Sequence, residues 1–143
     1  MDRRRVTDQF SVSSQLDPHD LEILARQGIR TLINNRPDGE HRLQPRTADL
    51  ARAARELGLA YVDLPVSSGA LTGDVIDRFE SLYREVEAPV LAFCRSGTRS
   101  ISLWALAEAR TRGADEVIRQ AAEAGYDLSG LRPRLAEQAR ARD

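Results

Sequence analysis

The run Pro89-Val90-Leu91-Ala92-Phe93 is the feature that most limits the fold of this chain. It is continuously apolar, without the alternation of a half-exposed strand, and such a run is typical of a strand buried on both faces of a sheet. Shorter strand-like runs precede it and alternate with helical patterns, at residues 10–12, 30–34 and 60–66. Strands separated by helices indicate a mostly parallel central sheet flanked by helices. The sequence therefore predicts an α/β fold.

Capping and breaking residues set the expected ends of the helices. Asp17 and Pro18 are typical of an N-cap and a first helical residue, and Gly28 ends the same helix. Thr72 is expected to cap a later helix in the same way. The other predicted helices cover residues 45–57, about 99–111, 115–124 and 128–140.

The length, net charge and composition of the chain exclude several classes of function. The chain has 143 residues, so we expect one domain over residues 1–143. Its net charge of -1 gives no overall field to attract nucleic acid or a membrane surface. All basic residues are arginine, which excludes lysine-dependent chemistry such as a Schiff base. The first residues do not form an apolar secretory signal, and a cytoplasmic protein is expected.

Cys94 is the one cysteine of the chain and heads the polar segment Cys94-Arg95-Ser96-Gly97-Thr98-Arg99-Ser100. This segment links the buried strand to a predicted helix, so backbone N–H groups would point at the sulfur and favour negative charge. We therefore expect Cys94 to be a thiolate nucleophile, and Arg99 to offer a planar fork to a bound oxyanion. The oxyanion or sulfur cradle would comprise Arg95, Ser96, Gly97, Thr98 and Ser100. With only His19 and His41 besides, we expect no metal and no cofactor.

A turn-rich loop, Asn35-Arg36-Pro37-Asp38-Gly39-Glu40, follows another predicted strand. In mostly parallel sheets ligands bind outside the carboxyl ends of the strands, so this loop is expected to border the same site. Arg36 and Asp38 are the candidate substrate-binding residues, Arg36 as a second anion contact. The alternative is that these residue types simply form turns, and for Asp38 that alternative is favoured.

Segments spread over almost the whole chain resemble one bacterial family. They include Phe10-Ser11-Val12-Ser13, Ile33-Asn34-Asn35-Arg36-Pro37-Asp38-Gly39-Glu40, Leu64-Pro65-Val66, Leu103-Trp104-Ala105 and the Cys94 segment. The family is DUF442, the phosphatase-like domain of beta-lactamase-hydrolase-like proteins. The resemblance implies the fold of dual-specificity and tyrosine phosphatases. Members occur alone or fused to persulfide dioxygenase or rhodanese domains, which implies persulfide metabolism and a persulfide dioxygenase as a candidate partner.

The Cys94 segment is similar to two kinds of active-site loop. It resembles the Cys-x-x-Gly-x-Arg-Ser loop of rhodanese sulfurtransferases. It also resembles the loop of tyrosine and dual-specificity phosphatases, in which a His precedes the Cys and the Arg comes six positions after it. Here Phe93 precedes Cys94, Arg99 comes five positions after it, and Ser100 takes the phosphatase Arg position. These departures favour the rhodanese-like interpretation.

The choice between sulfur and phosphorus depends on a general acid. Phosphatases of this type take an Asp from the loop after the third strand, but here that loop is Pro65-Val66-Ser67-Ser68-Gly69. General acid catalysis contributes about 10²–10⁴-fold, whereas transfer of sulfur needs none. We therefore predict a sulfurtransferase in which Cys94 takes sulfur from thiosulfate or a persulfide and passes it to a small thiol such as glutathione. The alternatives are a phosphatase acting on a phosphate ester through a phosphocysteine, and a non-catalytic redox sensor. A carboxylate near Cys94 and a cradle wide enough for phosphate would indicate the phosphatase.

Overall fold

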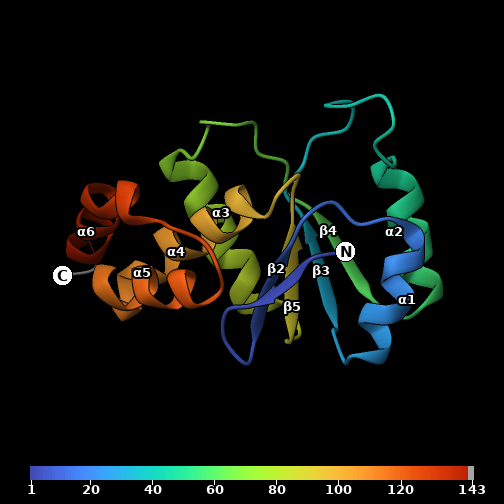
Figure 1. The fold of residues 1–143 in the computed structure, drawn as a ribbon, viewed down its shortest axis with the longest axis horizontal. Coiled ribbons are helices and arrows are strands. Elements are labelled where there is room, and N and C mark those ends of the chain that lie inside the picture. Colours follow the sequence, from blue (N-terminus) through green and yellow to red (C-terminus); the bar gives the residue numbers. More distant parts are fainter. Residues whose placement is uncertain (142–143) are drawn as a thin grey trace.

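A computed structural model describes residues 1–141 of the chain. Within them one sheet has the strand order β1-β2-β5-β3-β4 (Figure 1). The neighbouring pairs β2–β5, β5–β3 and β3–β4 are parallel, and β1 runs antiparallel to β2 at one edge. The strands are β1 (Arg3–Arg5), β2 (Phe10–Ser13), β3 (Thr31–Asn34), β4 (Ala60–Asp63) and β5 (Val90–Phe93). The predicted α/β fold with a mostly parallel sheet is confirmed.

Helices cover both faces of this sheet (Figure 1). α1 (Pro18–Arg26) and α2 (Thr47–Glu56) lie on one face. The other face carries α3 (Gly73–Glu85), α4 (Thr98–Arg112), α5 (Ala114–Glu123) and α6 (Arg132–Ala141), with a short 3-10 turn, Ser129–Leu131, before α6. Among residues 1–141, no helix is both long enough and apolar enough to cross a bilayer.

β5 contributes to the apolar core on each side of the sheet. Val90 and Ala92 belong to the larger core beneath α3 to α6, whereas Leu91 and Phe93 belong to the smaller core beneath α1 and α2. All four side chains are buried. The run is continuously apolar because successive residues of a strand point to opposite faces and both faces here are covered.

Most predicted boundaries hold, and the differences have local causes. Asp17 and Thr72 cap their helices as predicted, each accepting a backbone N–H with its side chain. The sequence did not predict β1, because an Arg-Arg-Arg run lacks apolar alternation, although charged side chains are usual on an edge strand. β4 ends at Asp63, short of the predicted residue 66, and α2 begins at Thr47, two residues later than predicted.

Candidate active site

Three loops meet at the carboxyl edge of the sheet, and Asn35 joins them. They are the Cys94 loop between β5 and α4, the loop 35–46 after β3, and the loop 64–72 after β4. The Asn35 N–H donates to the carbonyl of Phe93 at 2.8 Å, and its side-chain amide donates to the carbonyl of Leu64 at 2.9 Å. Its side-chain oxygen accepts from Ser100 Oγ at 2.8 Å, and its carbonyl accepts from the Val66 N–H at 2.9 Å. The hydrogen bonds of Asn35 thus fix the positions of the three loops relative to one another.

Cys94 lies at the end of β5 and is only 1% exposed. The N–H of Gly97 donates to its Sγ at 3.1 Å, and α4 begins at the next residue, Thr98. The sulfur therefore lies at the N-terminal end of a helix, where negative charge is stabilised. This is the environment that the sequence predicts for a thiolate nucleophile.

Both the backbone conformation at position 97 and the packing around it require glycine. Its φ of +94° lies in the left-handed region, which a residue without a Cβ adopts at little cost. A Cβ at this position would overlap the hydroxyl of Tyr126. That hydroxyl donates to the carbonyl of Ser96 at 2.9 Å, so Tyr126 braces the Cys94 loop from the segment between α5 and α6. Sequence reasoning missed Tyr126, because nothing in the order of residues links it to a loop thirty positions earlier.

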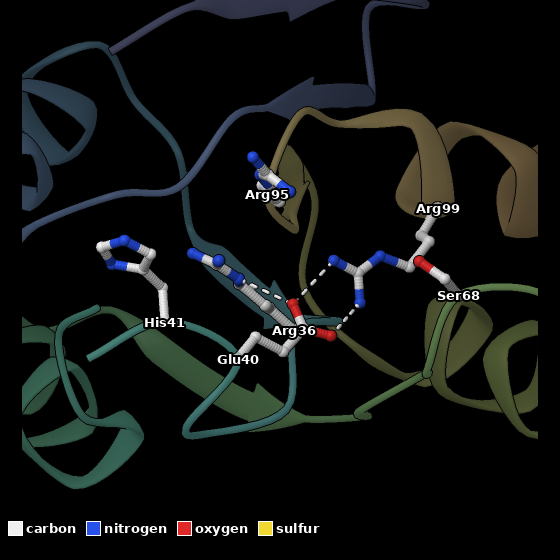
Figure 2. Close-up of a pocket in the computed structure, with 6 residues that line it drawn as sticks. All are labelled: Arg36, Glu40, His41, Ser68, Arg95 and Arg99. Carbon is white, nitrogen blue, oxygen red and sulfur yellow. Dashed lines mark hydrogen bonds and ion pairs between the residues drawn. The ribbon is translucent and has the colours of Figure 1, made fainter. Parts of the chain in front are cut away.

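Arg99 extends from the first turn of α4 and pairs with Glu40 of the loop after β3 (Figure 2). Its Nη1 donates to Glu40 Oε2 at 2.7 Å and its Nη2 donates to Oε1 at 2.9 Å. Nη1 also donates to the carbonyl of Val66 at 2.8 Å. Arg36 Nε donates to the same Glu40 Oε1 at 2.8 Å. The Glu40 carboxylate is therefore held between two guanidinium groups.

Electrostatics in this cluster favour the charged forms. The hydrogen bond from Arg99, with that from Arg36, lowers the pKa of Glu40 to about 2. The pKa of Arg99 is raised, mainly by its hydrogen bond to Glu40 and then by the negative charge of Cys94. Arg99 therefore joins the Glu40 carboxylate to the surroundings of Cys94.

A cavity of about 340 Å³ opens above these groups, lined by Arg36, Glu40, His41, Ser68, Arg95 and Arg99 (Figure 2). An adjoining hollow of about 600 Å³ shares Ser68, Arg95 and Arg99 with it and extends past Ser96 and Thr98. Arg36 is 6% exposed and donates to Gln15 Oε1 at 3.1 Å, whereas the guanidinium of Arg95 has no polar partner within residues 1–141. The cavity therefore presents one free and two engaged guanidinium groups.

The structure brings together some of the predicted site residues and separates others. Cys94, Arg95, Arg99 and Arg36 converge at the cavity or beneath it. Ser96 and Thr98 lie on the rim, with their hydroxyl oxygens 3.0 Å apart. Within the described part of the chain, no group of three or more His, Cys, Asp or Glu side chains is arranged to hold a metal ion.

Two predicted site residues lie elsewhere. Ser100 is fully buried, and its hydroxyl donates a hydrogen bond to Asn35 beneath the loop instead of facing the cradle. Asp38 does not line the cavity, because its carboxylate accepts from the N–H and the hydroxyl of Thr47 at 2.9 and 2.8 Å at the start of α2. The turn interpretation thus fits Asp38 better than the substrate-binding one. Glu40, which the sequence placed in this loop without a role, is the residue that reaches the cavity.

Comparison with known proteins decides the family. Residues 2–111 match the family described as "Beta-lactamase hydrolase-like protein, phosphatase-like domain". The chain belongs to this family. A beta-lactamase hydrolase-like protein of Agrobacterium fabrum is 36% identical over 105 residues, which is 73% of this chain and 24% of that protein. The chain thus spans about a quarter of the length of this curated relative.

Solved structures share the fold of this phosphatase-like domain. A candidate phosphatase from Neisseria meningitidis superposes with a TM-score of 0.86 at 34% identity, over 96% of this chain and 99% of that one. Tk-PTP superposes with a TM-score of 0.68 at 16% identity, over 99% and 98% of the two chains, and shows likeness of fold alone. The predicted tyrosine-phosphatase-like fold is confirmed.

Proposed function

We propose that the chain is a thiol-dependent phosphatase that acts on a small phosphate ester. The observation that carries the proposal is the Glu40 carboxylate bound by Arg36 and Arg99 beside the Cys94 loop. The site already holds an anion with the planar fork that suits a phosphoryl group. It also contains a carboxylate, which is one of the two expected marks of a phosphatase.

The chemistry follows from the elements around the sulfur. The Cys94 thiolate attacks phosphorus and forms a phosphocysteine, the bond from phosphorus to the ester oxygen breaks, and the alcohol or phenol leaves. The N–H of Gly97, the loop behind it and Arg99 stabilise the phosphoryl oxygens. Arg95 and Arg36 complete the positive lining of the cavity and draw in an anionic substrate. Water then attacks the phosphocysteine and releases inorganic phosphate.

Sulfur transfer has less support than its alternative. The prediction of a sulfurtransferase rested on the short spacing from Cys94 to Arg99 and on the lack of an acid in the loop after β4. Glu40 supplies a carboxylate from another loop, the one after β3, and pairs with Arg99. The family and the Neisseria structure favour a phosphatase, and they lend no support to a thiol acceptor or to a persulfide dioxygenase as partner. A redox sensor stays a prediction, which measured turnover would exclude.

The test compares two adducts on one cysteine. The purified chain is expected to hydrolyse an aryl phosphate, and a rapid acid quench should leave one phosphoryl group on Cys94 by intact mass. Cys94→Ser should abolish both the turnover and the adduct. Absence of hydrolysis, together with one added sulfur on Cys94 after incubation with thiosulfate, would overturn the proposal in favour of sulfur transfer.

A further inference from the structure

The carboxylate of Glu40 is the only one that lines either hollow beside the Cys94 loop, within residues 1–141. We propose that Glu40 is the proton carrier of the reaction, giving a proton to the leaving-group oxygen and then taking one from the attacking water. This inference rests on the proposed phosphatase function, because a proton carrier is needed only when an oxygen leaves.

The hydrogen bonds of Glu40 change when a substrate enters. Within residues 1–141 the Glu40 carboxylate accepts three hydrogen bonds, two from Arg99 and one from Arg36. A phosphoryl group bound above Cys94 competes for the same Arg99 fork, since one guanidinium edge cannot serve two anions at once. Glu40 then keeps only its bond to Arg36. The partner that chiefly depresses its pKa is lost, and the carboxylate becomes able to take up a proton.

The charges that face the cavity also favour a proton on Glu40 when a substrate is bound. Arg36 comes from the loop after β3, Arg95 from the Cys94 loop and Arg99 from α4, while His41 adds a titratable imidazole from the loop of Glu40 itself. Three guanidinium groups thus face Glu40, and the proposed Cys94 thiolate would add a second anion beneath them. A dianionic phosphoryl group would leave one negative charge in excess, and one proton on Glu40 removes it.

The two half-reactions then balance. In the first, the Cys94 sulfur forms a bond to phosphorus, the bond from phosphorus to the ester oxygen breaks, and protonated Glu40 gives its proton to that oxygen, which leaves as an alcohol. In the second, the Glu40 carboxylate takes a proton from water as the water oxygen attacks phosphorus and the bond from phosphorus to sulfur breaks. Glu40 ends protonated and Cys94 ends as a thiolate, and the proton returns to solvent when phosphate leaves.

Binding of sulfate tests the proton uptake without any turnover. Sulfate stays dianionic in mildly acidic solution, so calorimetry in two buffers of different ionisation enthalpy counts only protons taken up by the protein. The wild-type chain should take up about one proton per sulfate bound, and Glu40→Gln should take up almost none while still binding sulfate. His41→Asn should still take up about one proton per sulfate bound, which separates Glu40 from the other titratable side chain of the cavity lining. Equal uptake by the wild type and Glu40→Gln, or no uptake by the wild type, would refute the inference.

The leaving group separates a proton donor from a merely structural residue. Glu40→Gln should lower kcat about 10²–10⁴-fold on an alkyl phosphate, whose leaving oxygen needs a proton. The loss should be much smaller on p-nitrophenyl phosphate, whose leaving group departs without one. Glu116→Gln is the matched control, because Glu116 also accepts from two nitrogens of one guanidinium, that of Arg119, on α5 away from the site.

The outcomes for the two proposals are distinguishable. If Cys94-dependent hydrolysis occurs and Glu40→Gln loses equal activity on both esters, or none on either, Glu40 is not the proton carrier although the phosphatase function stands. If no phosphate ester is hydrolysed at all, the phosphatase function fails and the role of Glu40 fails with it, even if sulfate binding takes up a proton.

Discussion

The loops after β3 and β4 leave neighbouring parallel strands at the same edge of the sheet, yet they serve the Cys94 loop very differently. The loop after β3 brings two charged side chains, Arg36 and Glu40, into contact with each other and, through Glu40, with Arg99. The loop after β4 brings no charged side chain to the cavity. It contributes Ser68 to the lining and the carbonyl of Val66 to Arg99.

Strand order explains this difference. β5 lies between β2 and β3, whereas β4 pairs only with β3 and is one strand further away. The loop after β3 is therefore the nearer of the two to Cys94, and a side chain of ordinary length bridges the gap to Arg99. The sequence places no general acid in the loop after β4, where one is expected of a phosphatase. The carboxylate that reaches the cavity instead comes from the loop after β3, which is nearer to Cys94.

Removing the side chain that contacts both loops should have the largest effect. Arg99→Ala loses the fork that binds Glu40 and Val66, and that would bind the substrate, so we expect kcat/KM to fall about 10²–10³-fold. Arg99→Lys should recover only part of this loss, because an ammonium lacks the fork. Arg52→Ala, which removes an exposed arginine paired with Asp49 on α2, is the control for a general loss of charge. Equal rates for Arg99→Ala and the control would show that neither loop acts through Arg99.

Separating the two loops from each other should cost stability. Asn35→Ala leaves the buried carbonyl of Leu64 and the hydroxyl of Ser100 without their partner, and we expect the free energy of unfolding to fall by about 1–3 kcal/mol. Denaturant unfolding at constant m-value measures the change. Ser68→Ala in the loop after β4 should stay within about 0.5 kcal/mol of the wild type. A harmless Asn35→Ala would mean that the loops are held by backbone contacts alone.

A matched pair of glycines sharpens the comparison of the loops. Gly39 and Gly69 both have a φ of +81°, and neither would have an atom within 4 Å of an added Cβ. Alanine at either position should therefore cost a similar free energy of unfolding, about 1 kcal/mol, from backbone strain alone. Only Gly39→Ala should also lower kcat/KM clearly, since Gly39 precedes Glu40. Equal loss of activity in both variants would make the two loops functionally equivalent.

The smallest expected effect is on stability in acid. The pKa of Glu40 in the folded chain is about 2, below its ordinary value of 4.5, so the carboxylate stabilises the fold above that ordinary value. This contribution is lost as the pH falls from 4.5 toward 2. The free energy of unfolding should therefore fall less steeply in this window for Glu40→Gln than for the wild type. The difference should be on the order of 1 kcal/mol, and parallel slopes would contradict it.

Much of the fold follows from local patterns in the sequence. The apolar run at β5 predicted a strand buried on both faces, and Asp17 and Thr72 marked the starts of their helices. Gly97 lies in the loop before α4, as its place in the Cys94 segment predicted, and its positive φ is a local requirement that glycine meets. Such features depend on a few consecutive residues, so the order of residues is enough to find them.

The site depends on contacts between distant residues and was predicted less well. Glu40 and Arg99 are 59 positions apart, and only the strand order brings them together. Ser100 has a hydroxyl in the right segment, but the first turn of α4 directs it toward Asn35 and away from the cavity. A signal for Glu40 did exist in its spacing of four from Arg36, in a loop at the carboxyl edge, although such pairs are also common on surfaces.

The contact between Tyr126 and the Cys94 loop matters to anyone who cuts or fuses this chain. The match to the family ends at residue 111, but Tyr126 braces Ser96 from beyond it, and Leu135 of α6 is fully buried in the core that α4 shares. A fragment trimmed to the matched residues would lose this brace and uncover an apolar side of α4. For expression and domain grafting, the useful boundary therefore lies after α6 and not where similarity to the family stops.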